Sequence, residues 1–254
     1  MRHPALTTTV LCLAAAIGLT ACGSSEAKPK APFADDSGPE IVDKAIKATT
    51  GASSLTVKGD VTDPEMGALT LDLAVDTKGE CTGSLSVAGE GTAELTKTGD
   101  TLYMKFDEKF LRAQGKDDPK EETDATVNMI GNRWLKMDAS GEDAKDMTGL
   151  CDLDELLGEF KDVKSPARKG KTTTVDGQEA ITLTEQDGKD RYELLVATKG
   201  KPYLLKVTSK GGDEPGTLNF SDYEKPVNAK APADKDIVDL DELEGTDGAD
   251  GAES

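Results

Sequence analysis

The stretch Leu69-Thr70-Leu71-Asp72-Leu73-Ala74-Val75 alternates large apolar residues with small or polar ones. A period of two places the leucines and Val75 on one side of a β-strand and the intervening residues on the other. A strand of this kind has one buried and one solvated face, which is typical of antiparallel sheets. The stretch therefore predicts an antiparallel sheet with one apolar face.

The same alternation recurs further along the chain and forms two blocks of strands. Glycine-bearing turns such as Thr77-Lys78-Gly79 and Asp176-Gly177 separate the runs, as expected for strands that follow one another in a meander. From Leu55 onward the two blocks predict roughly nine or ten strands, in similar numbers. Beyond the first stretch, the alternating residues are Leu85 and Val87; Leu102, Met104 and Phe106; Ile181 and Leu183; Tyr192, Leu194 and Val196; Leu205 and Val207; and Leu218 and Phe220.

Three short helices are predicted before and between these blocks. The first begins at Ser37-Gly38-Pro39 and ends at Gly51, because Pro39 suits a first helical turn and apolar residues recur at helical spacing. A helix-permissive segment spans residues 119–131, and a strand follows at 132–137. The clearest helix covers residues 152–160, in which Asp152 and Glu155 have the spacing of a capping box.

The apolar strand faces exceed the cover that three short helices can supply. A sheet with one apolar face must bury it against a second sheet, against helices, or by closing on itself. The pattern leaves two solutions open: a sandwich or small barrel with a filled core, and a half barrel whose concave side and helices enclose an apolar cavity. The candidate cavity residues, each of which could equally be an ordinary core residue, are Leu71, Leu73, Leu85, Val87, Leu102, Met104, Phe106, Leu194, Val196, Leu205 and Val207.

The N-terminus has the features of an export signal. A short basic start precedes an apolar run from about Val10 to Leu19, and the run ends in Leu19-Thr20-Ala21-Cys22. This ending resembles a bacterial lipobox, which implies cleavage before Cys22, attachment of diacylglycerol to its thiol, and acylation of the new N-terminus. An ordinary secretory signal with an incidental cysteine is the alternative. The run is too short for a spanning helix.

These features divide the chain into four parts. Residues 1–21 are predicted to be the lipoprotein signal peptide, and residues 22–37, which are small, polar and proline-bearing, a flexible tether. Residues 38–243 form the folded domain. Residues 244–254 are predicted to be a disordered acidic tail.

Charge and histidine content narrow the possible functions. Removal of residues 1–21 leaves 29 basic against 49 acidic residues, a net charge of −20, and removes the single histidine, His3. An acidic surface argues against sequence-independent binding of nucleic acid or of anionic headgroups. The absence of histidine excludes Ser-His and Cys-His catalysis and His-ligated zinc. No cofactor or metal site is predicted.

Two cysteines remain after Cys12 leaves with the signal peptide and Cys22 takes the lipid. In an exported chain, the pair Cys81 and Cys151 predicts a disulfide that joins the third helix to the first strand block. A pair of catalytic thiols is the alternative, but no base is available to activate them.

The order of elements is similar to that of the LppX/LprG-type lipoproteins of actinobacteria, which share the LolA-like fold. The similar features are a lipobox with a tether, an N-terminal helix, a strand meander, and a helix at Asp152-Leu153 before the second strand block. The segments that carry the resemblance are Gly99-Asp100-Thr101-Leu102-Tyr103-Met104-Lys105, Asn132-Arg133-Trp134-Leu135-Lys136, Val175-Asp176-Gly177-Gln178-Glu179-Ala180, Gly200-Lys201-Pro202-Tyr203-Leu204-Leu205, Phe220-Ser221-Asp222-Tyr223 and Pro226-Val227. The resemblance implies an α+β fold: an antiparallel half-barrel sheet with helices on its concave face, which holds acylated lipids or lipoglycans at the cell envelope.

We therefore expect a non-enzymatic lipoprotein, anchored outside the cytoplasm by its acyl chains, that binds or carries an amphiphilic lipid or glycolipid in an apolar cavity. The alternative is an interaction or regulatory lipoprotein that uses the curved sheet as a scaffold for a membrane-protein partner. A hydrolase with paired carboxylates such as Asp152 and Asp154 is a third possibility, although so acidic a chain contains carboxylate pairs by chance.

Overall fold

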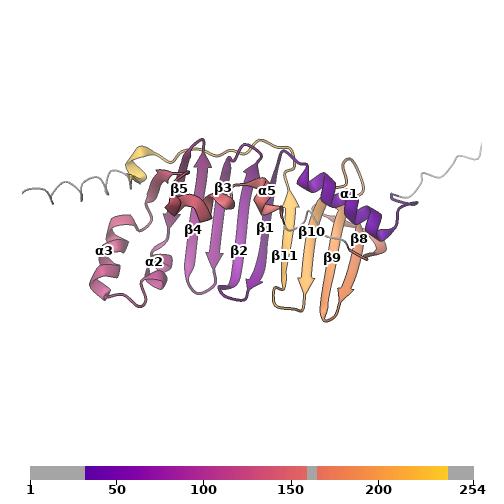
Figure 1. Ribbon diagram of the computed structural model, residues 1–254, viewed down its shortest axis with the longest axis horizontal. Helices are drawn as coiled ribbons and strands as arrows, with labels where there is room; N and C mark the ends of the chain where they lie inside the picture. Colours follow the sequence, from indigo (N-terminus) through magenta and orange to yellow (C-terminus); the bar gives the residue numbers. More distant parts are fainter. Residues whose placement is uncertain (1–31, 159–164, 240–254) are drawn as a thin grey trace, which may run out of the picture. The chain divides into compact units, whose positions relative to one another are not determined.

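The computed structural model describes residues 32–158 and 165–239. Within them, twelve strands form one sheet in the order β12-β6-β5-β4-β3-β2-β1-β11-β10-β9-β8-β7 (Figure 1). The strands are β1 Ser54–Asp63, β2 Gly67–Asp76, β3 Cys81–Val87, β4 Gly91–Thr98, β5 Thr101–Phe106, β6 Trp134–Asp138, β7 Arg168–Val175, β8 Gln178–Asp187, β9 Asp190–Ala197, β10 Leu204–Lys210, β11 Gly216–Ser221 and β12 Ile237–Asp239. The predicted signal peptide and acidic tail lie outside the described residues.

The two predicted strand blocks join into a single sheet through β1 and β11. Residues 56–61 of β1 pair antiparallel with residues 216–221 of β11, so each block continues the other. The pairing of β12 with β6 is parallel, whereas every other neighbouring pair is antiparallel. The sheet is not closed, because β12 and β7 form its two ends. The predicted α+β fold with a large open antiparallel sheet is confirmed.

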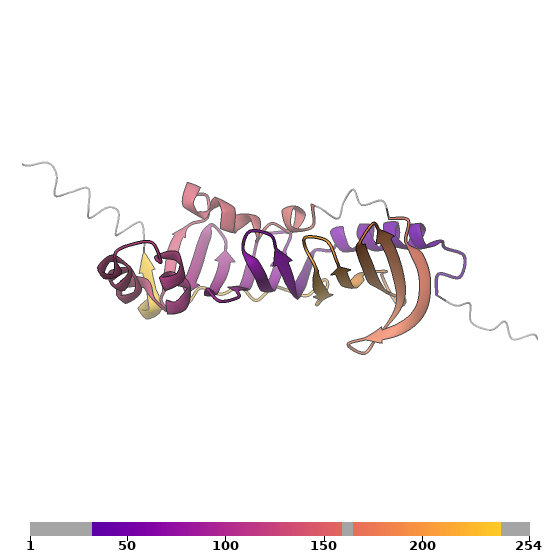
Figure 2. The ribbon, with the colours of Figure 1, turned by 90° about the horizontal axis from the view of Figure 1, so that it is seen from below.

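Helices occupy part of one side of this sheet, as the view in Figure 2 shows for α1 and for the segment that contains α4 and α5. The first helix begins with a capping box, in which the Ser37 hydroxyl accepts from the Glu40 backbone N–H and the Glu40 carboxylate accepts from the Ser37 backbone N–H. The helices are α1 Gly38–Thr50, α2 Glu108–Gln114, α3 Lys120–Ile130, α4 Lys145–Gly149 and α5 Leu153–Leu156, with short 3₁₀ turns η1 Glu142–Ala144 and η3 Asp234–Asp236.

The first helix binds the sheet through an apolar stripe and one buried hydroxyl. Ile41, Val42 and Ala45 are fully buried in the main core. Thr49 is also fully buried, and its hydroxyl accepts a hydrogen bond of 3.0 Å from the backbone N–H of Leu204 in β10. This bond gives the Leu204 N–H an acceptor on the helix. The stripe and the hydroxyl together fix α1 over the second strand block.

Strands β4, β7 and β12 and helix α2 were not predicted from the sequence. In β7 seven of eight side chains are exposed, so no apolar alternation exists to mark it. Strand β4 ends at residues 96–98, directly before the turn that leads into β5. The predicted third helix is only one turn long among the described residues, Leu153–Leu156, and the end of its predicted range lies beyond them.

Leu205 was expected on the same side of the sheet as Val207, and the structure corrects this. The register between β9 and β10 shifts between Leu204 and Lys206, so the alternation changes phase at this point. Leu204 belongs to the main core, whereas Leu205 packs in a separate small cluster with Leu195. A strict period of two cannot reveal an irregularity of this kind.

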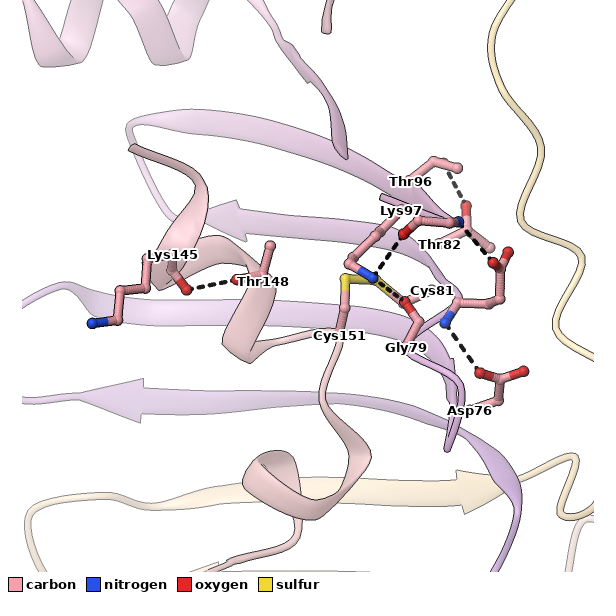
Figure 3. Close-up of a disulfide and its surroundings, with 11 residues drawn as sticks. Asp76, Gly79, Cys81, Thr82, Thr96, Lys97, Lys145, Thr148 and Cys151 are labelled. Atoms are coloured by element: carbon pink, nitrogen blue, oxygen red, sulfur yellow. Dashed lines mark hydrogen bonds between the residues drawn. A yellow bond between two sulfur atoms is a disulfide. The ribbon is translucent and has the colours of Figure 1, made fainter. Parts of the chain in front are cut away.

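A disulfide joins Cys81, the first residue of β3, to Cys151, which lies between α4 and α5 (Figure 3). The two Cα atoms are 5.3 Å apart, and both residues are buried. Leu153 and Leu157, which follow directly, are also buried in the main core. The disulfide and these leucines therefore hold the α4–α5 segment on the sheet.

Candidate apolar binding site

The helix-facing side of the sheet contains two neighbouring rows of side chains with different cover. Residues paired across strands share a face, so the register identifies each row. The first row crosses six strands and consists of Met104, Leu95, Gly83, Leu73, Val57 and Phe220. Its side chains are at most 4% exposed. This row is a filled core.

The second row lies two residues further along each strand. It crosses nine strands and consists of Phe106, Ala93, Leu85, Leu71, Gly59, Leu218, Val207, Leu194 and Leu183. We call its six half-buried apolar side chains the apolar trough: Phe106, Leu85, Leu71, Leu218, Val207 and Leu194.

Gly59 lies in the middle of the trough row, between Leu71 and Leu218. A Cβ atom built on it would be only 1.9 Å from the backbone oxygen of Thr217. Glycine therefore permits a close approach of β1 and β11 at the junction of the two strand blocks. The same absence of a side chain lowers the floor of the trough at this point.

A hollow of about 470 Å³ adjoins the trough where β1 and β10 end and β2, β9 and β11 begin. Val207 and Leu218 belong to both, and Val61, Leu69 and Tyr192 extend the apolar lining. This volume lies in the range of small-molecule pockets, about 300 to 1,000 Å³. The trough and the hollow together form the candidate site.

Four carboxylates line the hollow and form its acidic rim: Asp63, Asp190, Asp213 and Glu214. No Lys or Arg is among the described residues that line it. One of these carboxylates has a structural role, because Asp63 accepts hydrogen bonds from the backbone N–H groups of Glu65 and Met66. The rim thus combines negative charge with an apolar floor.

The structure separates the predicted cavity residues into groups. Five of them, Leu71, Leu85, Phe106, Leu194 and Val207, lie in the trough. Leu73 and Val196 are fully buried in the main core, while Leu102 and Met104 are buried with Ala144 in a smaller cluster. Val87 is 7% exposed and pairs with Leu69, and Leu205 lies in the separate cluster described above.

Four residues of the site were not predicted as cavity residues: Val61, Leu69, Leu218 and Tyr192. Three of them, Leu69, Leu218 and Tyr192, belong to the apolar alternation. The alternation shows which face they occupy but not how far the helices extend over that face. The position of helical cover along the strands was the missing information.

A charged hydrogen-bond network lies outside the trough, in the chain that follows β11. The Glu224 carboxylate accepts hydrogen bonds from Lys201 Nζ and Tyr203 Oη, both at 2.7 Å, and from the backbone and hydroxyl of Ser53. These donors, above all Lys201, hold the pKa of Glu224 well below its usual range. Burial raises the pKa of the neighbouring Tyr223, whose hydroxyl donates to the Leu204 carbonyl. The network ties the chain after β11 to β1 and β10.

The carboxylate pair considered for hydrolysis has a structural explanation. The Asp152 side chain accepts from the backbone N–H groups of Asp154 and Glu155 and so caps α5. A polar hollow of about 620 Å³ lies beside Asp152 and the disulfide, and its lining includes Lys97 and Lys145 (Figure 3).

Among residues 32–158 and 165–239, no group of three or more His, Cys, Asp or Glu side chains could hold a metal ion. No helix of the described segments is long and apolar enough to cross a membrane.

Comparison with known proteins gives matches in structure and none in sequence. No family model matches the chain, and no curated protein matches it. The crystal structure of LprF from Mycobacterium bovis matches with a TM-score of 0.53 and 15% identity over 77% of this chain and 97% of LprF. The Mycobacterium tuberculosis lipoprotein LppX matches with a TM-score of 0.48 and 15% identity, over 76% of this chain and 98% of LppX. The similarity to LprF confirms the fold predicted from the resemblance: the chain has the fold of LprF.

Proposed function

We propose that this protein is an extracytoplasmic lipoprotein, anchored to the membrane through acylated Cys22, that binds an amphiphilic lipid or glycolipid. The acyl chains would lie along the apolar trough, and the polar head would remain in water at its edge. The main support is the row of six half-buried apolar side chains beside a filled row. Such side chains lose contact with water when an acyl chain covers them, which contributes about 0.8 kcal/mol per buried methylene.

The acidic rim determines which probe suits a binding test. Four carboxylates border the hollow, so an anionic fatty acid would be repelled there. An uncharged fluorescent monoacylglycerol avoids this repulsion and keeps the acyl chain that the trough would bind.

Val207 and Val196 form a matched pair for the test. Val207 lies half-buried in the trough, whereas Val196 is fully buried in the core. Val207→Trp should change stability little and weaken probe binding by roughly 15- to 60-fold, the effect of losing two or three methylene contacts. Val196→Trp should instead overpack the core and cost about 1 to 3 kcal/mol of unfolding free energy. Probe titration and chemical denaturation give a binding affinity and an unfolding free energy for each of the two variants.

The outcomes separate binding from a purely structural trough. If the parent domain binds no acyl probe and native mass spectrometry finds no amphiphile after gentle purification, lipid binding is wrong. The alternative, a rigid scaffold for a membrane-protein partner, then gains support from the filled first row.

Anchoring is tested separately through Cys22. Cys22→Ala should abolish acylation and release the protein from the membrane fraction, because two or three acyl chains give nearly permanent attachment. Continued sedimentation of the variant with membranes at high salt would contradict the lipobox interpretation.

A further inference from the structure

Strand β7 is an exposed basic edge on an acidic protein. Its sequence, Arg168-Lys169-Gly170-Lys171-Thr172-Thr173-Thr174-Val175, has three basic residues and no acidic one, whereas the whole chain carries −19. Every residue of it except Val175 is exposed. It is also one of the two ends of the sheet.

The backbone of this edge is poorly suited to pairing with another strand. Its register with β8 shifts between Lys169 and Thr172, and Gly170 lies within the irregular part. Irregular pairing and basic side chains are the features that block strand addition at sheet edges. A partner would therefore contact the charged side chains of this edge and would not pair with its backbone hydrogen-bonding groups.

Acidic residues near this edge are in part already neutralised. Asp36 forms an ion pair of 2.7 Å with Lys44. Glu179 lies 3.4 Å from Lys199.

On the solvent side of Arg168, a hollow contains Arg191 together with Glu185 and Glu193. The Ser165 hydroxyl donates to Glu185. The two arginines and two glutamates of this hollow balance each other in charge, and β7 adds Lys169 and Lys171 without an acidic residue of its own.

The chain leading back to Cys22 begins at this same edge. The Lys169 ammonium donates to the backbone oxygens of Phe33 and Asp36, just before α1. A Cβ on Gly38 would be 1.8 Å from the Ala167 oxygen, so the start of α1 lies directly against the chain that enters β7. Cys22 and Pro32 are ten positions apart in the chain, which limits their distance to about 35 Å.

We propose that the basic edge formed by Arg168, Lys169 and Lys171 faces the anionic headgroups of the membrane in which the protein is anchored. This inference rests on the proposed anchoring at Cys22. The anchor brings the edge near the bilayer, and each basic residue close to an anionic surface adds attraction. The acidic remainder of the domain is repelled, so the charge distribution orients the domain with β7 toward the membrane.

The test uses the acylated full-length protein on vesicles. Acylation is verified by intact mass, and attachment by sedimentation with vesicles of equal parts phosphatidylglycerol and phosphatidylcholine, or of phosphatidylcholine alone. An amine-reactive label and mass spectrometry then give the modification rate of Lys171 relative to Lys116, an exposed lysine between α2 and α3. On the anionic vesicles at 0.1 M salt, the relative rate at Lys171 should fall about fivefold. It should recover at 1 M salt, where the screening length is about 3 Å.

Two charge reversals provide the matched comparison. Arg168→Glu should remove most of the protection of Lys171, whereas Lys109→Glu, the same charge change at an exposed site in α2, should leave it intact. Equal modification of Lys171 and Lys116 on sedimented anionic vesicles overturns the proposal while leaving the anchor in place. Protection that persists on neutral vesicles and at 1 M salt also overturns it, because the protection then does not depend on anionic headgroups. Failure to sediment instead shows that the anchoring has failed, and the orientation with it.

Discussion

Removal of the Cys81–Cys151 disulfide should destabilise the folded domain by about 4 kcal/mol. The two cysteines are 70 residues apart in the chain. Closing a loop of this length lowers the entropy of the unfolded chain by about 15 cal/mol/K, or about 4.4 kcal/mol at 25 °C. The loop contains β4, β5, α2, α3 and β6, so the unfolded chain gains freedom over a large part of the first strand block.

The assay compares three proteins by denaturant unfolding: the oxidised domain, the same domain after reduction, and the Cys81→Ala/Cys151→Ala variant. Reduction leaves both side chains in place, so the change in unfolding free energy on reduction measures the effect of closing the loop. The double variant adds the cost of the small cavities left at two buried positions. Labelling of the unfolded, non-reduced protein should find neither thiol free.

Two results would refute this reasoning. Stoichiometric labelling of both thiols would show that the disulfide is absent. If the disulfide is present but reduction changes the unfolding free energy by less than about 1 kcal/mol, the disulfide does not restrict the unfolded chain as the loop length implies. Residual structure in the unfolded state between β3 and α5 would then be the explanation to test.

Two further predictions concern the attachment of elements to the sheet. Thr49→Val should lower the unfolding free energy by about 1 to 3 kcal/mol, because it leaves a buried strand N–H without its acceptor. Thr50→Val removes a less buried hydroxyl that bonds within α1, so it should lower the unfolding free energy less. Urea unfolding of both variants tests this, and equal losses would contradict it. Glu224→Gln should lower the melting temperature at pH 7, because the donors around Glu224 stabilise the folded protein only while its carboxylate is ionised. The difference in melting temperature from the parent should therefore shrink as the pH falls below about 4.5. A difference that stays constant from pH 7 to pH 3 would rule out this linkage.

The sequence predicted the sheet well because its signal is local. The alternation at residues 69–75 corresponds to the buried positions Leu69, Leu73 and Val75 of β2 and the half-buried Leu71. The first helix was predicted with nearly correct ends, since Ser37 and Pro39 are specific signals of a helix start. Period and capping act over a few residues and can be read from a single chain.

The features that the sequence did not reveal depend on distant parts of the chain. The exposed strand β7 is held by pairing with β8 and not by burial of its own side chains, so it leaves no apolar pattern. The pairing of β1 with β11 merges the two blocks across more than 150 residues. Such pairings depend on tertiary contacts that local propensity does not encode.

The two solutions left open by the pattern, a filled core and an apolar cavity, both describe part of this sheet. Val196 lies in the covered part of the helix-facing side, and Val207, on the neighbouring strand, lies in the part that the helices leave half-open. The filled and half-buried rows are only two residues apart along each strand, a distance of about 7 Å. Because this offset is one full pleat, both rows face the same way and have the same apolar pattern in sequence. Only the extent of helical cover distinguishes them, and for this reason a bulky substitution should affect stability in one row and ligand binding in the other.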